Sequence, residues 1–172
     1  QGYSSAAQMC IRDSAMIAAL TDGIKQLVAA GVGVITVPCN LAHCYFEEMQ
    51  QAAAGVPLLH IADSALEKLP TTARRIMVLA TEPTLQSGFY QQRLLDNRYV
   101  YSEPPALRQL TTQLIADTKQ HGFNSPDAAS LWQQISTLTC QADAVLIACT
   151  DITPLIARFP DNSLRVDTAQ SL

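Results

Sequence analysis

Two cysteines stand where the sequence pattern favours chemistry. Cys39 follows the β-branched run at residues 32–37, and Cys149 follows the apolar run at residues 144–148. A cysteine between a parallel strand and a helix lies at the sheet edge where α/β proteins bind ligands, and a helix N-terminus favours its thiolate. We therefore predict that Cys39 and Cys149 are a pair of reactive thiols. Asn40 and Thr150, which follow them, can cap a helix or donate a hydrogen bond to a bound carboxylate.

Two opposed thiols suit the inversion of a stereocentre at carbon. One face of the carbon needs a base and the other an acid, because a single group that returned the proton to the same face would regenerate the starting isomer. Backbone N–H groups near the two cysteines could hold a substrate carboxylate where negative charge accumulates. Such a reaction requires neither a metal nor an organic cofactor.

The elements that would position these thiols alternate along the chain. Helical spacing predicts helices from Ala15 to a stop at Gly31 and over the segment that follows Cys39. Buried strands are expected at residues 32–37, after Pro57, from Arg74, at 144–148 and from Leu164. Further helices are expected at Pro83–Leu95, Pro105–His121, Pro126–Thr139 and just after Cys149.

This order predicts an α/β protein with parallel sheets covered by helices, and the two strand–cysteine–helix units favour two lobes with the active site between them. We expect residues 1–57 plus 163–172 to form the first lobe and residues 58–162 the second. The first 14 residues contain no apolar strand, although a doubly wound lobe begins with a strand and its crossover helix. The first lobe is therefore expected to lack its N-terminal strand–helix unit, and residues 1–14, including Cys10, are given no role.

Several segments resemble the aspartate/glutamate racemase family. Residues 34–43, VITVPCNLAH, resemble its first catalytic motif IPCNTAH, and residues 146–155, LIACTDITPL, resemble its second, LGCTEIPLL. The segments PLLHIADSA, LATEPTLQSGFY and VDTA also resemble family segments, in the same order. The resemblance implies a fold of two similar doubly wound lobes that face one another, and cofactor-independent racemisation of aspartate or glutamate. It leaves open whether the homodimer common in the family forms. Separately, because the sequence shows no membrane-spanning run and no leader pattern, we expect a cytoplasmic protein.

The resemblance also implies roles for individual residues. Cys39 and Cys149 would be the proton donor/acceptor pair. The positions that would line the substrate are Asn40, Leu41, Thr81, Thr84, Lys119, Thr150 and Asp151. Leu41 stands where the family has a threonine, and Asp151 where it has a glutamate. The family's glycine-rich first loop and an arginine on the N-terminal lobe have no counterpart here.

Composition narrows the partners. The net charge is −4, and no cluster of lysine and arginine is long enough to follow a phosphate backbone, so we expect no nucleic acid partner. No apolar run reaches the roughly 20 residues that span a bilayer, so we expect no membrane. We read the odd set of five cysteines as reduced thiols. Cys44 and Cys140 are expected to be small buried hydrophobic residues, and His60 a core histidine.

Three alternatives remain from the residues alone. Cys39 and His43 are four residues apart and could share a metal ion on one helix face, with Cys44 nearby. Because the adjacent His43 and Cys44 point in different directions, we expect no metal. A related two-lobed isomerase or decarboxylase of small dicarboxylates would use one or both cysteines. An inactive, incomplete homologue would only bind a small acid or pack with a partner.

Overall fold

The computed structural model describes residues 3–160 and 163–172, and their side chains from residue 13 onward. The chain forms two compact units, Gln1–Val37 with Tyr45–His60 (unit 1) and Pro38–Cys44 with Ile61–Leu172 (unit 2). None of the described helices combines the length and apolar content needed to cross a membrane. Unit 2 contains both Cys39 and Cys149.

Unit 1 contains two helices, α1 (Tyr3–Ala29) and α2 (Phe46–Ala52), which pack together. The helix expected from Ala15 is present, but α1 begins earlier, at Tyr3, so the predicted start was wrong. The end of α1 is followed by Gly31, as expected, with φ of 76°. The lengths of the strands expected at residues 32–37 and after Pro57 were overestimated. Among the described residues of unit 1, this pairing consists of one parallel bridge between Ile35 and Leu58.

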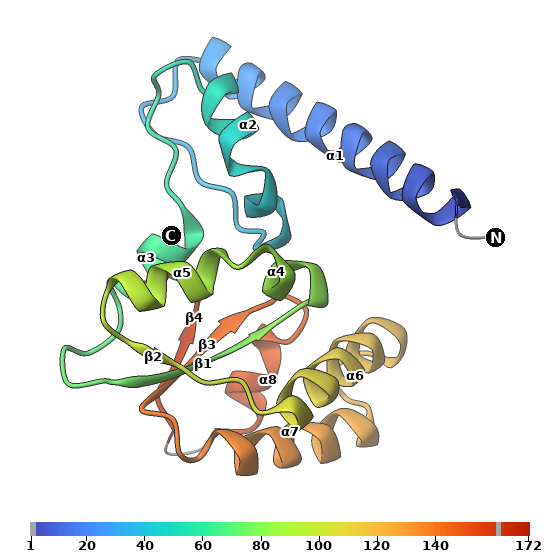
Figure 1. Ribbon diagram of the computed structural model, residues 1–172, viewed down its shortest axis with the longest axis vertical. Helices are drawn as coiled ribbons and strands as arrows, with labels where there is room; N and C mark the ends of the chain where they lie inside the picture. Colours follow the sequence, from blue (N-terminus) through green and yellow to red (C-terminus); the bar gives the residue numbers. More distant parts are fainter. Residues whose placement is uncertain (1–2, 161–162) are drawn as a thin grey trace. The chain divides into compact units, whose positions relative to one another are not determined.

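Unit 2 is built on a four-stranded parallel sheet with strand order β2-β1-β3-β4 (Figure 1). The strands are β1 (Arg75–Ala80), β2 (Val100–Tyr101), β3 (Ala144–Ala148) and β4 (Arg165–Asp167). The expected strands from Arg74, at 144–148 and from Leu164 are confirmed, and so is the α/β class. The two-residue strand β2 was not predicted, because its pairing with β1 involves only Arg75 and Ile76.

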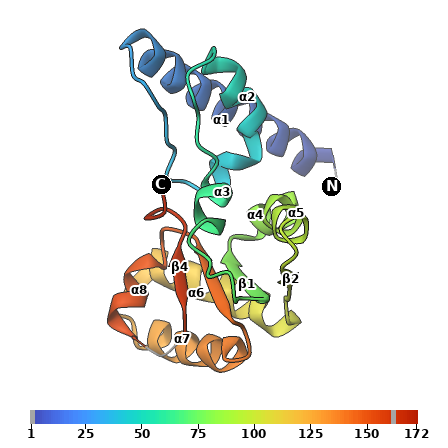
Figure 2. The ribbon, with the colours of Figure 1, turned by 90° about the vertical axis from the view of Figure 1, so that its left-hand side faces the viewer.

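Both faces of this sheet are covered by helices, as Figure 2 shows. Alternate residues of β1 and β3 point to opposite faces. Ile76 and Leu146 join a core with α3 (Ile61–Leu66) and α5 (Phe89–Asp96). Met77 and Ile147 join a second core with α6 (Pro105–His121), α7 (Pro126–Thr139) and α8 (Thr153–Arg158). The strands read as continuous apolar runs because both of their faces are buried.

The helices of unit 2 follow the expected pattern with one difference. The bounds predicted for Pro105–His121 and Pro126–Thr139 are those of α6 and α7, and each helix begins at a proline. The single helix expected at Pro83–Leu95 is instead two, α4 (Glu82–Ser87) and α5, separated at Gly88. Gly88 has φ of 74°, a left-handed conformation that ends an α-helix.

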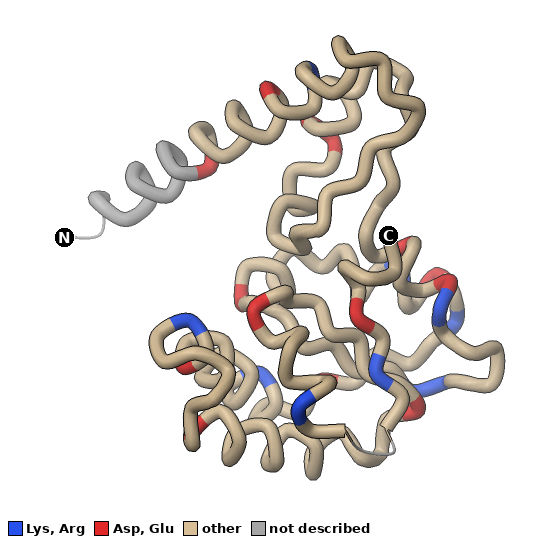
Figure 3. The backbone as a smooth tube through the Cα atoms, turned by 180° about the vertical axis from the view of Figure 1, so that it is seen from behind, with Lys and Arg blue, Asp and Glu red and all other residues tan. Residues whose placement is uncertain are grey.

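The C-terminal segment was expected in the first lobe but lies in unit 2. Residues 165–167 form β4, which pairs with β3 at Val145, Leu146 and Ile147. The expected division therefore differs from the observed units at residues 163–172, because strand pairing joins this segment to β3. It also differs at residues 38–44, which lie in unit 2, and at residues 58–60, which lie in unit 1. Figure 3 shows acidic and basic residues interspersed along unit 2. Ion pairs there join Arg93 to Asp63 and Arg108 to Glu82.

Candidate active site

One pocket of unit 2 brings together all of the site residues expected from the sequence. Its volume is about 120 Å³. It is lined by Cys39, Asn40, Leu41, Thr81, Thr84, Lys119, Ala148, Cys149, Thr150 and Asp151. These residues come from four segments: the loop before the 3₁₀ helix η1 (Leu41–Tyr45), the start of α4, the last turn of α6, and the loop after β3. The pocket lies at the carboxyl ends of β1 and β3, where open α/β sheets bind ligands.

Cys149 follows the last residue of β3 and is buried, with 6% of its surface exposed. Its thiol donates a hydrogen bond to Asp151 Oδ2 across 3.6 Å. Burial, the largest cause, raises the pKa of Cys149 from 9.0 to about 11, and the charge of Asp151 adds to the effect. Cys149 does not lie at the helix start, because α8 begins only at Thr153, with Ile152 before it. A backbone hydrogen bond from Asp151 lowers the pKa of Cys149, but burial outweighs it.

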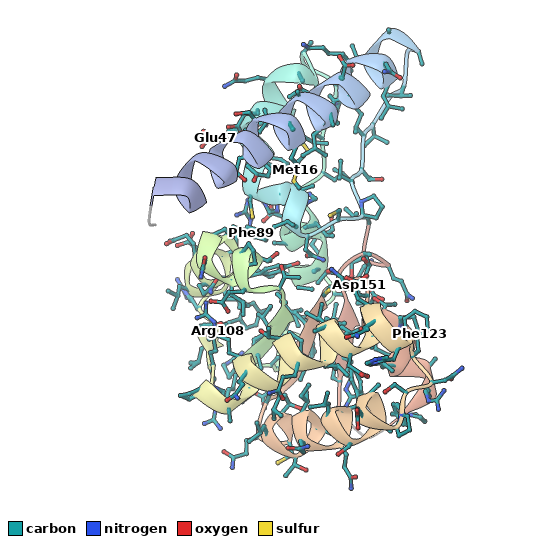
Figure 4. The ribbon with its side chains drawn as sticks, turned by 90° about the vertical axis from the view of Figure 1, so that its right-hand side faces the viewer. Met16, Glu47, Phe89, Arg108, Phe123 and Asp151 are labelled. Carbon is teal, nitrogen blue, oxygen red and sulfur yellow. The ribbon has the colours of Figure 1, made fainter. Side chains whose placement is uncertain are left out.

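Lys119 and Asp151 form an ion pair beside this thiol, with 3.1 Å between Lys119 Nζ and Asp151 Oδ2. Both side chains are partly exposed, so we assign this pair little net stabilisation. Asp151, labelled in Figure 4, thus contacts both Lys119 and the Cys149 thiol. Lys119 is the one basic side chain among the described residues that line the pocket.

Cys39 has an exposed side chain, and its backbone is held by His43. His43 Nδ1 lies 2.9 Å from the Cys39 carbonyl oxygen, and Nε2 accepts a hydrogen bond from the Ile61 N–H at 3.1 Å. The proton must therefore be on Nδ1, which donates to Cys39. Because both ring nitrogens are used in this way, the arrangement does not favour a shared metal ion. No group of three potential metal ligands occurs among the described residues.

Asn40 is 4% exposed, and its side chain is held by residues that sequence reasoning missed. The Tyr90 hydroxyl donates to Asn40 Oδ1, and Asn40 Nδ2 donates to Thr168 Oγ1. Both partners occur in segments that resemble the family, GFY and VDTA, but the resemblance alone assigned them no role. Neither Asn40 nor Thr150 appears as a side-chain cap of a described helix.

Thr81 and Thr84 line the pocket from the first turn of α4. Their hydroxyl oxygens lie 2.9 Å apart and share a hydrogen bond. Thr84 is fully buried, whereas Thr81 is partly exposed. Thr81 is therefore the more accessible hydroxyl of this pair.

Cys44 and Cys140 do not line this pocket. Cys140 was expected to be buried but is exposed, because it caps the C-terminus of α7 rather than lying in a strand. Cys44 is partly buried, and the side chain of Cys10 lies outside the described residues. His60 is buried and packs against Phe46, which confirms it as a core histidine.

The comparisons with known proteins agree with these motifs. The family described as Asp/Glu/Hydantoin racemase matches residues 3–170. The broad specificity amino-acid racemase RacX of Bacillus subtilis (strain 168) is 36% identical over 155 residues, which are 90% of this chain and 67% of that protein. A glutamate racemase of Campylobacter jejuni is 27% identical over 132 residues, which are 74% of this chain and 50% of that protein.

The fold of the chain is also found in solved racemase structures. The aspartate racemase of Picrophilus torridus has a TM-score of 0.74 at 24% sequence identity, with 90% of this chain and 64% of that chain covered. The chain belongs to the Asp/Glu/hydantoin racemase family. It spans between half and about two thirds of the length of these relatives.

Proposed function

We propose that this protein racemises an amino acid by a two-base mechanism in which Cys39 and Cys149 act on opposite faces of Cα. The observation that carries the proposal is the shared pocket, whose lining includes both thiols. The names of the relatives, a broad specificity amino-acid racemase, a glutamate racemase and an aspartate racemase, support the reaction class. No cofactor is needed for this chemistry.

The environments of the two thiols suggest their starting roles. Burial raises the pKa of Cys149 to about 11, so this thiol is protonated at neutral pH and begins as the acid. The mechanism needs a base on the other face, and we assign this role to Cys39, which is exposed. Its thiolate takes the Cα proton from one face, and Cys149 donates its own proton to the other face. The resulting Cys39 thiol and Cys149 thiolate then catalyse the reverse reaction or exchange protons with water.

We propose an acidic substrate, aspartate or glutamate. Lys119 supplies the positive charge that a second carboxylate requires, and a bound substrate would compete with Asp151 for it. Thr81, Thr84 and Thr150 supply hydroxyl groups, and Leu41 supplies an apolar wall. Asn40 is treated separately below, because its amide is engaged inside the protein.

The test follows exchange of the Cα proton with deuterium oxide by NMR, with L-aspartate, L-glutamate and L-alanine as substrates. We expect both exchange and inversion of an acidic substrate, with inversion followed by chiral chromatography. The rate of inversion should fall by at least about a hundredfold in the Cys39→Ser and Cys149→Ser variants, because each removes one acid/base group. Cys140→Ser is the matched control, since Cys140 is exposed and outside the pocket lining.

Each contrary outcome identifies the part of the proposal that fails. Inversion that survives in either pocket variant would contradict the two-base mechanism, whereas Cα exchange without inversion can persist where one thiol remains. Exchange with alanine but with neither acidic substrate would contradict the substrate class. No exchange with any of the three would leave the proposed activity without support in this chain.

A further inference from the structure

A chain of buried hydrogen bonds connects the segments that carry the two pocket cysteines. The Tyr90 hydroxyl donates to Asn40 Oδ1 at 2.5 Å, and Asn40 Nδ2 donates to Thr168 Oγ1 at 2.9 Å. Thr168 Oγ1 lies 3.1 Å from the Ile147 carbonyl oxygen. Tyr90 and Thr168 are both 0% exposed. A buried polar network whose members are paired in this way is rigid and fixes a single arrangement.

The two ends of the network lie next to the proposed acid/base groups. Asn40 directly follows Cys39, and Ile147 precedes Cys149 by two residues in β3. The Thr168 backbone N–H also donates to the Ile147 carbonyl, at 3.2 Å. Thr168 thus joins the Cys39 segment to β3 through two of its own atoms.

The network also constrains what Asn40 can do. Its Oδ1 accepts from Tyr90, and one hydrogen of its Nδ2 is donated to Thr168. Burial raises the pKa of the Tyr90 hydroxyl, which therefore remains a neutral donor. If the amide turned to bind a substrate carboxylate, two buried partners would lose their hydrogen bonds, at a substantial energetic cost.

We propose that Tyr90 and Thr168 are positioning residues that act through the Asn40 amide. They hold residues 38–44, the Cys39 segment, against β3, which ends directly before Cys149. Asn40 is then part of the support of the site. The inference rests on the proposed racemase function for its effect on rate. Its effect on the order of the Cys39 segment does not depend on activity.

The test compares Tyr90→Phe and Thr168→Val, which each remove a hydroxyl, with Thr168→Ser, which keeps it. Thr139→Val is the matched control, because Thr139 is 1% exposed and its hydroxyl bonds only to carbonyls of its own helix. Thermal unfolding verifies that each variant is folded. The readouts are kcat and KM for Cα exchange, and backbone hydrogen exchange of residues 38–44, which include the His43 N–H donated to the Asn40 carbonyl.

We expect Tyr90→Phe and Thr168→Val to lower kcat by about tenfold or more with little change in KM, because small displacements of a reacting group are costly. Thr168→Ser keeps the hydroxyl, so it should retain both the kcat of the unsubstituted chain and the protection of residues 38–44 from hydrogen exchange. The double variant should cost less than the product of the single effects, since both residues act through Asn40. Backbone hydrogen exchange of residues 38–44 should be faster in Tyr90→Phe and Thr168→Val and unchanged in Thr139→Val.

A raised KM with unchanged kcat would indicate a substrate contact and overturn the inference, as would effects no larger than those of Thr139→Val. If the unsubstituted chain shows no turnover, the proposed function fails, and hydrogen exchange alone decides the inference. Protection of residues 38–44 that is the same in all variants would then overturn it.

Discussion

The two pocket cysteines differ in exposure, and this difference assigns their chemistry. Cys149 is enclosed at the end of β3, and its thiol donates to Asp151. Cys39 lies on an exposed turn. In a two-base mechanism the resting protein needs one protonated and one ionised thiol, and a buried thiol keeps its proton more firmly than one in water. Burial of one partner therefore makes the pair unequal before substrate binds.

The raised pKa of Cys149 predicts a pH-dependent contribution to stability. The unfolded state releases this thiol proton first as the pH rises, because the folded-state pKa is raised from 9.0 to about 11. The stabilisation from neutral Cys149 is complete below the lower value and is lost as the pH rises through the higher one. Its full size is roughly 2–3 kcal/mol.

We therefore expect the difference in unfolding free energy between the parent and Cys149→Ala to shrink by about this amount between pH 8 and pH 11. Urea denaturation at a series of pH values measures it. Cys140→Ala, at an exposed cysteine that does not line the pocket, is the matched control. A constant difference for Cys149→Ala would contradict the raised pKa.

At the scale of elements, the break at Gly88 gives two short helices different tasks. α4 carries Thr81 and Thr84 to the pocket, and α5 carries Tyr90 to Asn40. A single straight helix would have fixed the two sets of side chains in one helical register. Gly88 is the C-cap of α4 and the N-cap of α5, with φ of 74°.

Gly88→Ala should reduce the free energy of unfolding by about 1 kcal/mol, because a Cβ disfavours the left-handed conformation. A Cβ at this position would meet no atom within 4 Å, so the cost comes from the backbone alone. Urea denaturation measures the change. Gly23→Ala, inside the helix α1, is the opposite control and should stabilise by about 0.5–1 kcal/mol. If Gly88→Ala left the free energy of unfolding unchanged, the break between α4 and α5 would not depend on glycine.

At the scale of the whole molecule, unit 2 owes its stability to two apolar cores separated by one sheet. Ile76 belongs to the core on the α5 face, and Ile135 belongs to the core on the α7 face. Both side chains are almost completely buried, at 0% and 1% exposure. The sheet separates the side chains of the two cores, because alternate residues of each strand face opposite sides.

Ile76→Val and Ile135→Val should each destabilise the protein by about 1 kcal/mol, as the loss of one buried methyl group usually does. The double variant should lose the sum to within about 0.5 kcal/mol, since the two sites share no partners. Chemical denaturation of the four proteins forms the cycle. A coupling well above this value would mean that the two faces form one core.

Local patterns in the sequence determined much of unit 2. The prolines at the start of α6 and α7 are local signals, because a helix forms its hydrogen bonds within one segment. The apolar runs of β1 and β3 are local signals as well, because both faces of these strands are buried. The paired cysteine motifs indicated the family, because each motif is a short continuous stretch around Cys39 or Cys149.

Only the tertiary structure decided the properties that depend on distant parts of the chain. Residues 32–37 and the apolar run after Pro57 were each expected to form a strand. Only Ile35 and Leu58 of these two segments form a bridge, since the length of a strand depends on its pairing. Asn40 meets Tyr90 and Thr168 across 50 and 128 residues of sequence, separations over which no local spacing carries information. The burial of Cys149 likewise arises from packing around it, so the sequence could name the thiol but not its protonation state.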